Sequence, residues 1–187
     1  MKPDFIIELK LEEIVTKLAW INVGLVVAFA AAYHLFAEPL SFGFSLFGIL
    51  YFTVGYAILI VLHELFHLIG FVIFGKVPLS SLTYGLELSK GYAYATSSAP
   101  LRNKQMRKVL LLPFWTTAVI PTIIGFWIHD QILVLLGAML AAGAAGDFFM
   151  YRELRKQKDE AWILDDPVLP RLRVYNEYPD PEDLPLE

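Results

Sequence analysis

Four long apolar runs constrain this chain more than any other feature of its sequence. They occupy about residues 18–37, 44–75, 109–128 and 132–150. Each reaches the roughly 20 residues that an α-helix needs to cross the hydrocarbon core of a bilayer. The second run is longer than one crossing requires, so we expect its helix to be tilted, broken or extended beyond the core. The sequence therefore predicts an all-α membrane protein with four transmembrane helices.

The basic residues are distributed very unevenly around these runs. All 15 Lys and Arg lie before the first run, between the second and third, or after the fourth, and the loops 38–43 and 129–131 contain none. Segments rich in Lys and Arg stay in the cytoplasm under the positive-inside rule. We therefore expect a multi-pass protein of the cell membrane, with both termini and the middle loop in the cytoplasm.

Two segments outside the runs have strand-like patterns. Residues 5–11 alternate apolar and mostly polar residues, which suits a strand, and an amphipathic helix at the membrane surface is the alternative. In the middle loop, residues 82–88 and 92–96 have strand composition and enclose Ser89-Lys90-Gly91. This pattern predicts a small cytoplasmic β-hairpin between transmembrane helices two and three.

The chain beyond residue 165 is rich in Pro, Asp and Glu. Segments of this composition bury too little apolar surface to fold, so we expect an extended or disordered tail. We accordingly divide the chain into one membrane-embedded domain, residues 1–164, and an acidic, Pro-rich cytoplasmic tail, residues 165–187. No basic cluster of the kind that binds nucleic acid is evident, and the lack of cysteine excludes thiolate metal ligands.

The second run contains the sequence His63-Glu64-Leu65-Phe66-His67. Positions i and i+4 of a helix lie on one face, so both imidazoles are able to reach one metal ion. Glu64 lies close enough to act as general base on a water that zinc activates. An ionisable group in mid-bilayer costs roughly 2.5–3.5 kcal/mol, so three within five residues indicate a bound partner. We predict one Zn²⁺ per chain, with His63 and His67 as ligands and Glu64 as the catalytic residue.

A catalytic zinc site usually has three protein ligands and a water. The one acidic residue in any other run is Asp147, near the cytoplasmic end of the fourth. Small residues in that run allow close helix packing, which would bring this carboxylate to the metal. We therefore predict Asp147 as the third ligand. The alternative is that it caps its helix or faces cytoplasmic water.

The remaining histidines and the acidic pair in the tail have simpler interpretations. The expected topology places His34 and His129 on the outer side, away from the metal, as interfacial residues. Asp165 and Asp166 are on the cytoplasmic side, where we assign them to a solvated tail.

The combination of His63, Glu64 and His67 in one span with Asp147 in a later span resembles the site-2 protease group of intramembrane zinc metalloproteases. More closely, the chain resembles the small prokaryotic "putative zincin peptidase" membrane family over most of its length. The resemblance rests on the HELFH span and on three further motifs, Ala99-Pro100-Leu101, Leu112-Pro113 and Ala145-Gly146-Asp147.

This resemblance implies that His63, His67 and Asp147 are the zinc ligands and that Glu64 is the catalytic residue. One departure concerns the aspartate. Site-2 proteases typically place it in an Asp-Gly pair, often preceded by Asn-Pro, whereas here Phe148 follows it.

The leading hypothesis is a zinc metalloprotease that hydrolyses peptide bonds within or at the surface of the cytoplasmic half of the membrane. Its partners would be the lipid bilayer and a membrane protein or peptide substrate, which the predicted hairpin either holds as an added strand or merely covers. Two alternatives remain: a non-catalytic metal-binding scaffold or regulator derived from a protease, and a metal-independent protease that uses Glu64 and a histidine. The sequence leaves the oligomeric state open.

Overall fold

The computed structural model describes residues 2–9, 11–41, 43, 45–87, 92–166 and 169–179, with the backbone alone for residues 11–14, 86–87 and 92. The chain is mostly helical and divides into two compact units. The helical unit comprises Leu11–His63 and Pro113–Ala145. The sheet unit comprises Met1–Lys10, Glu64–Leu112 and Gly146–Glu187.

The helical unit consists of long apolar helices that pack on one another. Helix α5 contacts α1, α4 and the π-helical segment η3. The core of the helical unit is a cluster of Leu59, Ala118, Leu136 and Leu140. The elements are α1 (Leu11–Phe36), the first part of α2 (Leu46–Gly70), η3 (Phe114–Val119), α4 (Ile120–Trp127) and α5 (Gln131–Gly143).

A glycine sets the distance between α4 and α5. A Cβ atom at Gly137 would lie 2.1 Å from the hydroxyl oxygen of Thr122 and 2.9 Å from the carbonyl oxygen of Ala118. Any larger residue would therefore push the two helices apart. This close approach is the kind of packing that small residues permit between membrane helices, as the composition of the fourth apolar run predicts.

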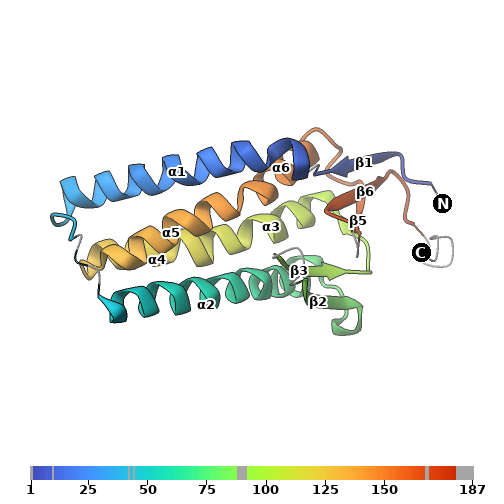
Figure 1. The fold of residues 1–187 in the computed structure, drawn as a ribbon. Coiled ribbons are helices and arrows are strands. Elements are labelled where there is room, and N and C mark those ends of the chain that lie inside the picture. The colour runs from blue at the N-terminus through green and yellow to red at the C-terminus, as the bar shows by residue number, and fades with distance from the viewer. Residues whose placement is uncertain are drawn as a thin grey trace. The chain divides into compact units, whose positions relative to one another are not determined.

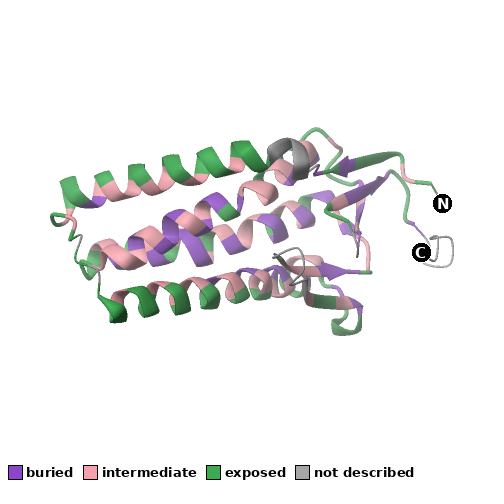
Figure 2. Ribbon diagram, in the orientation of Figure 1, coloured by how far each residue is buried: buried purple, intermediate pink, exposed green. Residues whose placement is uncertain are grey.

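Within the described residues, three helical stretches are long and apolar enough to cross a membrane: Val15–Phe36, Leu46–Gly75 and Asn103–Trp127. The long second run is thus helical from Leu46 to Gly75. The fourth run is instead a pair of helices, α5 and α6 (Ala145–Leu154), which meet at an angle of 40° and together make up a fourth candidate span. Large apolar side chains are exposed along α1 and α2 (Figure 2), as is expected of surfaces that face lipid.

The sheet unit is built on a four-stranded antiparallel sheet with the strand order β1-β6-β5-β4. Figure 1 shows the N-terminal strand β1 beside the C-terminal strand β6. Ile7 pairs with Leu172, and Ile163 pairs with Val174, and all four side chains are buried. The strands are β1 (Phe5–Glu8), β4 (Leu101–Arg102), β5 (Trp162–Asp165) and β6 (Arg171–Tyr175).

A second, two-stranded sheet lies in the middle loop. Strand β2 (Leu82–Glu87) pairs antiparallel with β3 (Tyr92–Ser97), where the sequence predicts the hairpin. The expected turn Ser89-Lys90-Gly91 lies outside the described residues. The rest of the sheet unit comprises the second part of α2, η1 (Phe71–Gly75), η2 (Leu79–Ser81), α3 (Asn103–Pro113) and most of α6.

Two predictions about the chain ends can be compared with the structure, one for the N-terminal segment and one for the C-terminal tail. The strand interpretation of the N-terminal segment is confirmed for Phe5–Glu8. The tail, expected to be extended or disordered, is extended but ordered at Arg171–Tyr175, because β6 is hydrogen-bonded on both sides. The carboxylate of Asp166 accepts hydrogen bonds from Arg171 at 2.6 Å and Arg173 at 2.7 Å. The solvated-tail interpretation is therefore wrong for Asp166, which this pairing buries.

Candidate metal centre

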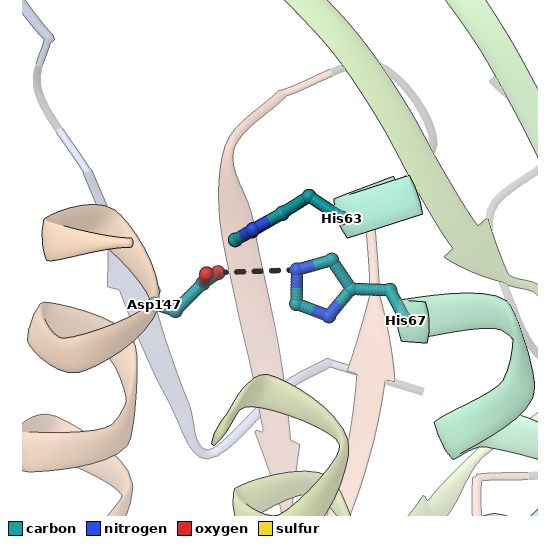
Figure 3. A group of neighbouring side chains, drawn as sticks. All are labelled: His63, His67 and Asp147. Carbon is teal, nitrogen blue, oxygen red and sulfur yellow. Dashed lines mark ion pairs between the residues drawn. The ribbon is translucent and has the colours of Figure 1, made fainter. Parts of the chain in front are cut away.

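The two histidines of the HELFH motif lie one turn apart on α2, as the spacing predicts. Both are almost fully buried, with 9% of His63 and 8% of His67 exposed. One ligand atom from each of these residues and one from Asp147 all lie within 4.8 Å of one another. Figure 3 shows the three side chains converging from α2 and α6. The structure thus brings together the three residues that the sequence singles out as metal ligands.

Asp147 owes its position to the break in the fourth apolar run. Helix α5 ends at Gly143 and α6 begins at Ala145, so Asp147 lies in the first turn of α6. A carboxylate is favoured there because the unpaired N–H groups carry partial positive charge. Its Oδ1 atom lies 3.5 Å from Nε2 of His67. The helix-end alternative and the ligand interpretation are therefore compatible.

The opposite end of α6 is anchored by Asn103, the first residue of α3. Its side-chain amide shares its two N–H hydrogens among the carbonyl oxygens of Leu154, Gln157 and Lys158, at 2.9, 3.2 and 2.9 Å. These carbonyls lie at and just after the end of α6, where intrahelical donors are missing. Because Asn103 is fully buried, this cap holds α6, and with it Asp147, against α3.

The donor set fits a zinc ion. Imidazole nitrogen and carboxylate oxygen are both common zinc ligands, at about 2.0–2.2 Å from the metal. Two such atoms on a tetrahedral ion lie roughly 3.4 Å apart, which the His67–Asp147 separation of 3.5 Å matches. That separation also exceeds the roughly 2.7–3.2 Å of an ordinary N–H···O hydrogen bond.

Each imidazole also has an oxygen beside its second nitrogen. Nδ1 of His67 lies 3.2 Å from the carbonyl oxygen of Val109 in α3. Nδ1 of His63 lies 3.3 Å from the hydroxyl of Thr117 in η3. In metal sites such partners fix the orientation and tautomer of a ligating histidine. Neither Val109 nor Thr117 was predicted from the sequence as part of the site.

Glu64 follows His63 on α2 and is partly exposed. It lies about 100° further round the helix than His63, and the cluster of ligand atoms comprises His63, His67 and Asp147. Its assignment as general base stays a prediction.

Asp165, at the end of β5, is a second acidic residue near the centre. Although the residue is partly exposed, burial of its carboxyl raises the pKa to about 7, and the neighbouring Thr96 hydroxyl and His67 oppose this shift only in part. The interpretation of Asp165 as part of a solvated tail is therefore wrong. No sequence signal was available, because its environment depends on the pairing of β5.

The other two histidines take no part in this centre. His34 accepts a hydrogen bond from the backbone N–H of Leu40 at 3.2 Å, and His129 lies 3.7 Å from the carboxylate of Glu38. Both contacts lie within the helical unit. Neither histidine belongs to the cluster of ligand atoms from His63, His67 and Asp147.

Comparison with known proteins finds one family whose model matches this chain. Residues 56–162 match the model of the family described as "Putative zincin peptidase", and this match covers more than half of the chain. It includes both histidines of α2, Glu64 and Asp147. A search of curated proteins and a search of solved structures found no match.

Proposed function

The chain belongs to the "Putative zincin peptidase" family, and from that premise we propose that it hydrolyses peptide bonds within or at the surface of a membrane, with Glu64 as general base. Family membership indicates zinc-dependent peptidase activity. The observation that carries the proposal is the convergence of His63, His67 and Asp147, whose ligand atoms lie within 4.8 Å of one another. We further propose that its mechanism resembles that of the site-2 proteases.

The residues of this chain divide the chemistry between them. A bound zinc would supply Lewis acidity, which polarises the scissile carbonyl and lowers the pKa of water. His63, His67 and Asp147 would hold the ion. Glu64 would take a proton from the attacking water as the new C–O bond forms, and would pass it to the amine nitrogen as the C–N bond breaks. One water is consumed, and a carboxylate and an amine are released.

The four-stranded sheet supports four crossings of the membrane. Strand β1 precedes α1, β4 lies between α2 and α3, and β5 and β6 follow α6, yet all four strands are hydrogen-bonded in one sheet. Strands of one soluble sheet lie on one side of a bilayer, because no sheet edge is stable within lipid. This pairing supports a chain that returns to the same side of the membrane after each pair of helices. The segments of the sheet unit contain 14 of the 15 Lys and Arg of the chain, all except Lys17, which supports a cytoplasmic location.

We propose membrane proteins or membrane-bound peptides as substrates. A peptide bond in a helix must be unwound before it is attacked, and an extended conformation is stabilised when a peptide adds a strand to a sheet edge. Within the described residues, β2 pairs with β3 alone, so one side of β2 is open to such an added strand. Leu79 and Tyr84, next to and within β2, are about three-quarters exposed and offer apolar contacts.

The first test is the zinc content of protein purified in detergent. We expect about one zinc per chain in the wild type and its loss in His67→Ala and in Asp147→Ala. His34→Ala is the matched control, because it removes a histidine that makes no contact with the centre. Wild-type protein that stays metal-free when zinc is supplied would contradict the zinc mechanism.

The second test separates a peptidase from a metal-binding scaffold. We expect Glu64→Gln to keep its zinc and to lose at least about 100-fold in cleavage of a library of single-span membrane peptides, measured by mass spectrometry. The control is Glu38→Gln, which changes an exposed carboxylate next to His129. Equal cleavage by Glu64→Gln and wild type would rule out this general base. A wild type that holds zinc but cleaves nothing would favour the scaffold.

A further inference from the structure

Both histidines of the metal centre have Nδ1 beside an oxygen from the same apolar helix, Asn103–Trp127. For His67 the oxygen is the carbonyl of Val109, and for His63 it is the hydroxyl of Thr117. Val109 and Thr117 are fully buried. Between them in sequence lies Pro113, where α3 ends and the π-helical segment η3 begins.

Pro113 explains why the Val109 carbonyl is available to a side chain. In an α-helix the carbonyl of residue i accepts a hydrogen bond from the N–H of residue i+4, and the partner of Val109 at that spacing is residue 113. Proline has no N–H, so this helical bond cannot form. A buried carbonyl needs a donor, and Nδ1 of His67 lies 3.2 Å away. Because a carbonyl only accepts, the proton must be on Nδ1 of His67.

Pro113 also determines what the Thr117 hydroxyl offers to His63. The hydroxyl of Thr117 donates to the carbonyl oxygen of Pro113 at 2.8 Å. Its single hydrogen is therefore used, and the oxygen faces Nδ1 of His63 at 3.3 Å with its lone pairs. It can only accept, so His63 must also have its proton on Nδ1.

We propose that Pro113 and Thr117 are positioning residues that set both imidazoles in the tautomer protonated on Nδ1, so that both Nε2 lone pairs are presented to the metal. The missing N–H of the proline frees the acceptor for His67, and the proline carbonyl orients the acceptor for His63. This inference rests on the proposed zinc site and names the residues that prepare it. A neutral imidazole ligates through its unprotonated nitrogen, so the opposite tautomer could not ligate through Nε2.

The chain offers a matched control for Thr117. A threonine hydroxyl that bonds the carbonyl four residues earlier is common in membrane helices. Thr122 makes the same bond to Ala118 at 2.8 Å but lies against Gly137 rather than a histidine. Thr117→Val and Thr122→Val therefore remove the same local bond, and Thr117→Val alone removes the oxygen beside His63. Thr117→Ser keeps that oxygen.

The first readout is the affinity for zinc, measured by competition with a chelator. Loss of a partner of a ligating histidine typically weakens metal binding by about 10–100-fold. We expect that loss in Thr117→Val, whereas Thr117→Ser and Thr122→Val stay within about threefold of the wild type. Pro113→Ala should also weaken binding, because the restored N–H competes with His67 for the Val109 carbonyl. Thr117→Val with wild-type affinity would overturn the proposal.

The second readout does not require zinc. The chain has 4 histidines, so nitrogen NMR of ¹⁵N-histidine-labelled protein gives few signals. In metal-free protein, at a pH where His63 is neutral, we expect its proton on Nδ1 in the wild type and a mixture of tautomers in Thr117→Val. A wild-type His63 protonated on Nε2 would overturn the proposal. If zinc does not bind but this tautomer is found, the proposed function fails and the positioning inference stands.

Discussion

The two units of this molecule are stabilised by different contacts, although they share the helices α2 and α3–η3–α4. The helical unit consists of apolar helices whose exposed surfaces are themselves apolar, and its core is the small cluster around Leu136. The sheet unit combines three segments of chain, and its core lies at strand pairings such as Ile7 with Leu172. A bilayer stabilises helices of the first kind one by one, whereas the second unit forms only when distant segments meet.

This difference matters for the chemistry. His67 and Asp147 both belong to the sheet unit, and their separation depends on how α6 is held by Asn103. The separation of these two candidate ligands is therefore set by non-local contacts within the sheet unit. His63 and the buried Thr117 both belong to the helical unit, where Nδ1 of His63 lies 3.3 Å from the Thr117 hydroxyl.

The largest expected effect comes from the core of the sheet. Leu172→Ala removes a buried side chain from β6 and should lower the free energy of unfolding of the sheet unit by about 2–5 kcal/mol. Leu35→Ala is the control, because Leu35 is 72% exposed on α1, and we expect a change within about 0.5 kcal/mol. Denaturant unfolding in detergent measures both. We also expect Leu172→Ala to weaken zinc binding, because the sheet unit contains His67 and Asp147. The apolar helices should stay inserted in the detergent micelle, because their stability does not depend on the sheet.

A smaller effect is expected in the helical unit at Gly137. A Cβ there would clash with Thr122, so Gly137→Ala should cost about 1–3 kcal/mol and lower the melting temperature in detergent. Gly24→Ala on α1 is the matched control, since nothing lies within 4 Å of its Cβ position. That change should stabilise by up to about 1 kcal/mol, because alanine is the better helix former. Equal effects at the two sites would mean that α4 and α5 are not in close contact.

A further expected effect concerns pH. The pKa of Asp165 is about 7 in the folded protein against 3.8 for an ordinary aspartate, so the folded state binds this proton more tightly. The resulting stabilisation is complete below about pH 4 and is lost as the pH rises through 7. Metal-free wild type should therefore become less stable over this interval, and Asp165→Asn should flatten the dependence. A steeper loss in Asp165→Asn would contradict the sign of this linkage.

The local features of this protein were predictable because they depend on neighbouring residues. Hydropathy predicted the apolar helices, alternation predicted the strand at Phe5–Glu8, and helical spacing placed His63 and His67 on one face. Asp147 could be chosen as third ligand because no other acidic residue lies in a run apart from Glu64. The structure then brings its carboxylate to within 3.5 Å of His67.

The features that were missed depend on pairing between distant segments. Strand β6 lies in a Pro-rich, acidic region whose composition predicts an extended or disordered tail, yet it is ordered by pairing with β1, more than 160 residues earlier, and with β5. The burial of Asp165 and Asp166 follows from the same pairing. The composition of a segment does not show whether another strand pairs with it, so it predicted the extended conformation but not the order.

The sequence by itself determined the apolar spans, the uneven distribution of basic residues and the chemistry of the HELFH helix, since each is a property of a continuous segment. The tertiary structure decided two further features. One is the break between α5 and α6, which places the Asp147 carboxylate near His67, and the other is the sheet that joins both chain ends. It also placed His67 beside the carbonyl of Val109, which lacks its usual helical donor because residue 113 is a proline. Those outcomes require segments far apart in the chain to meet, and only packing determines which ones do.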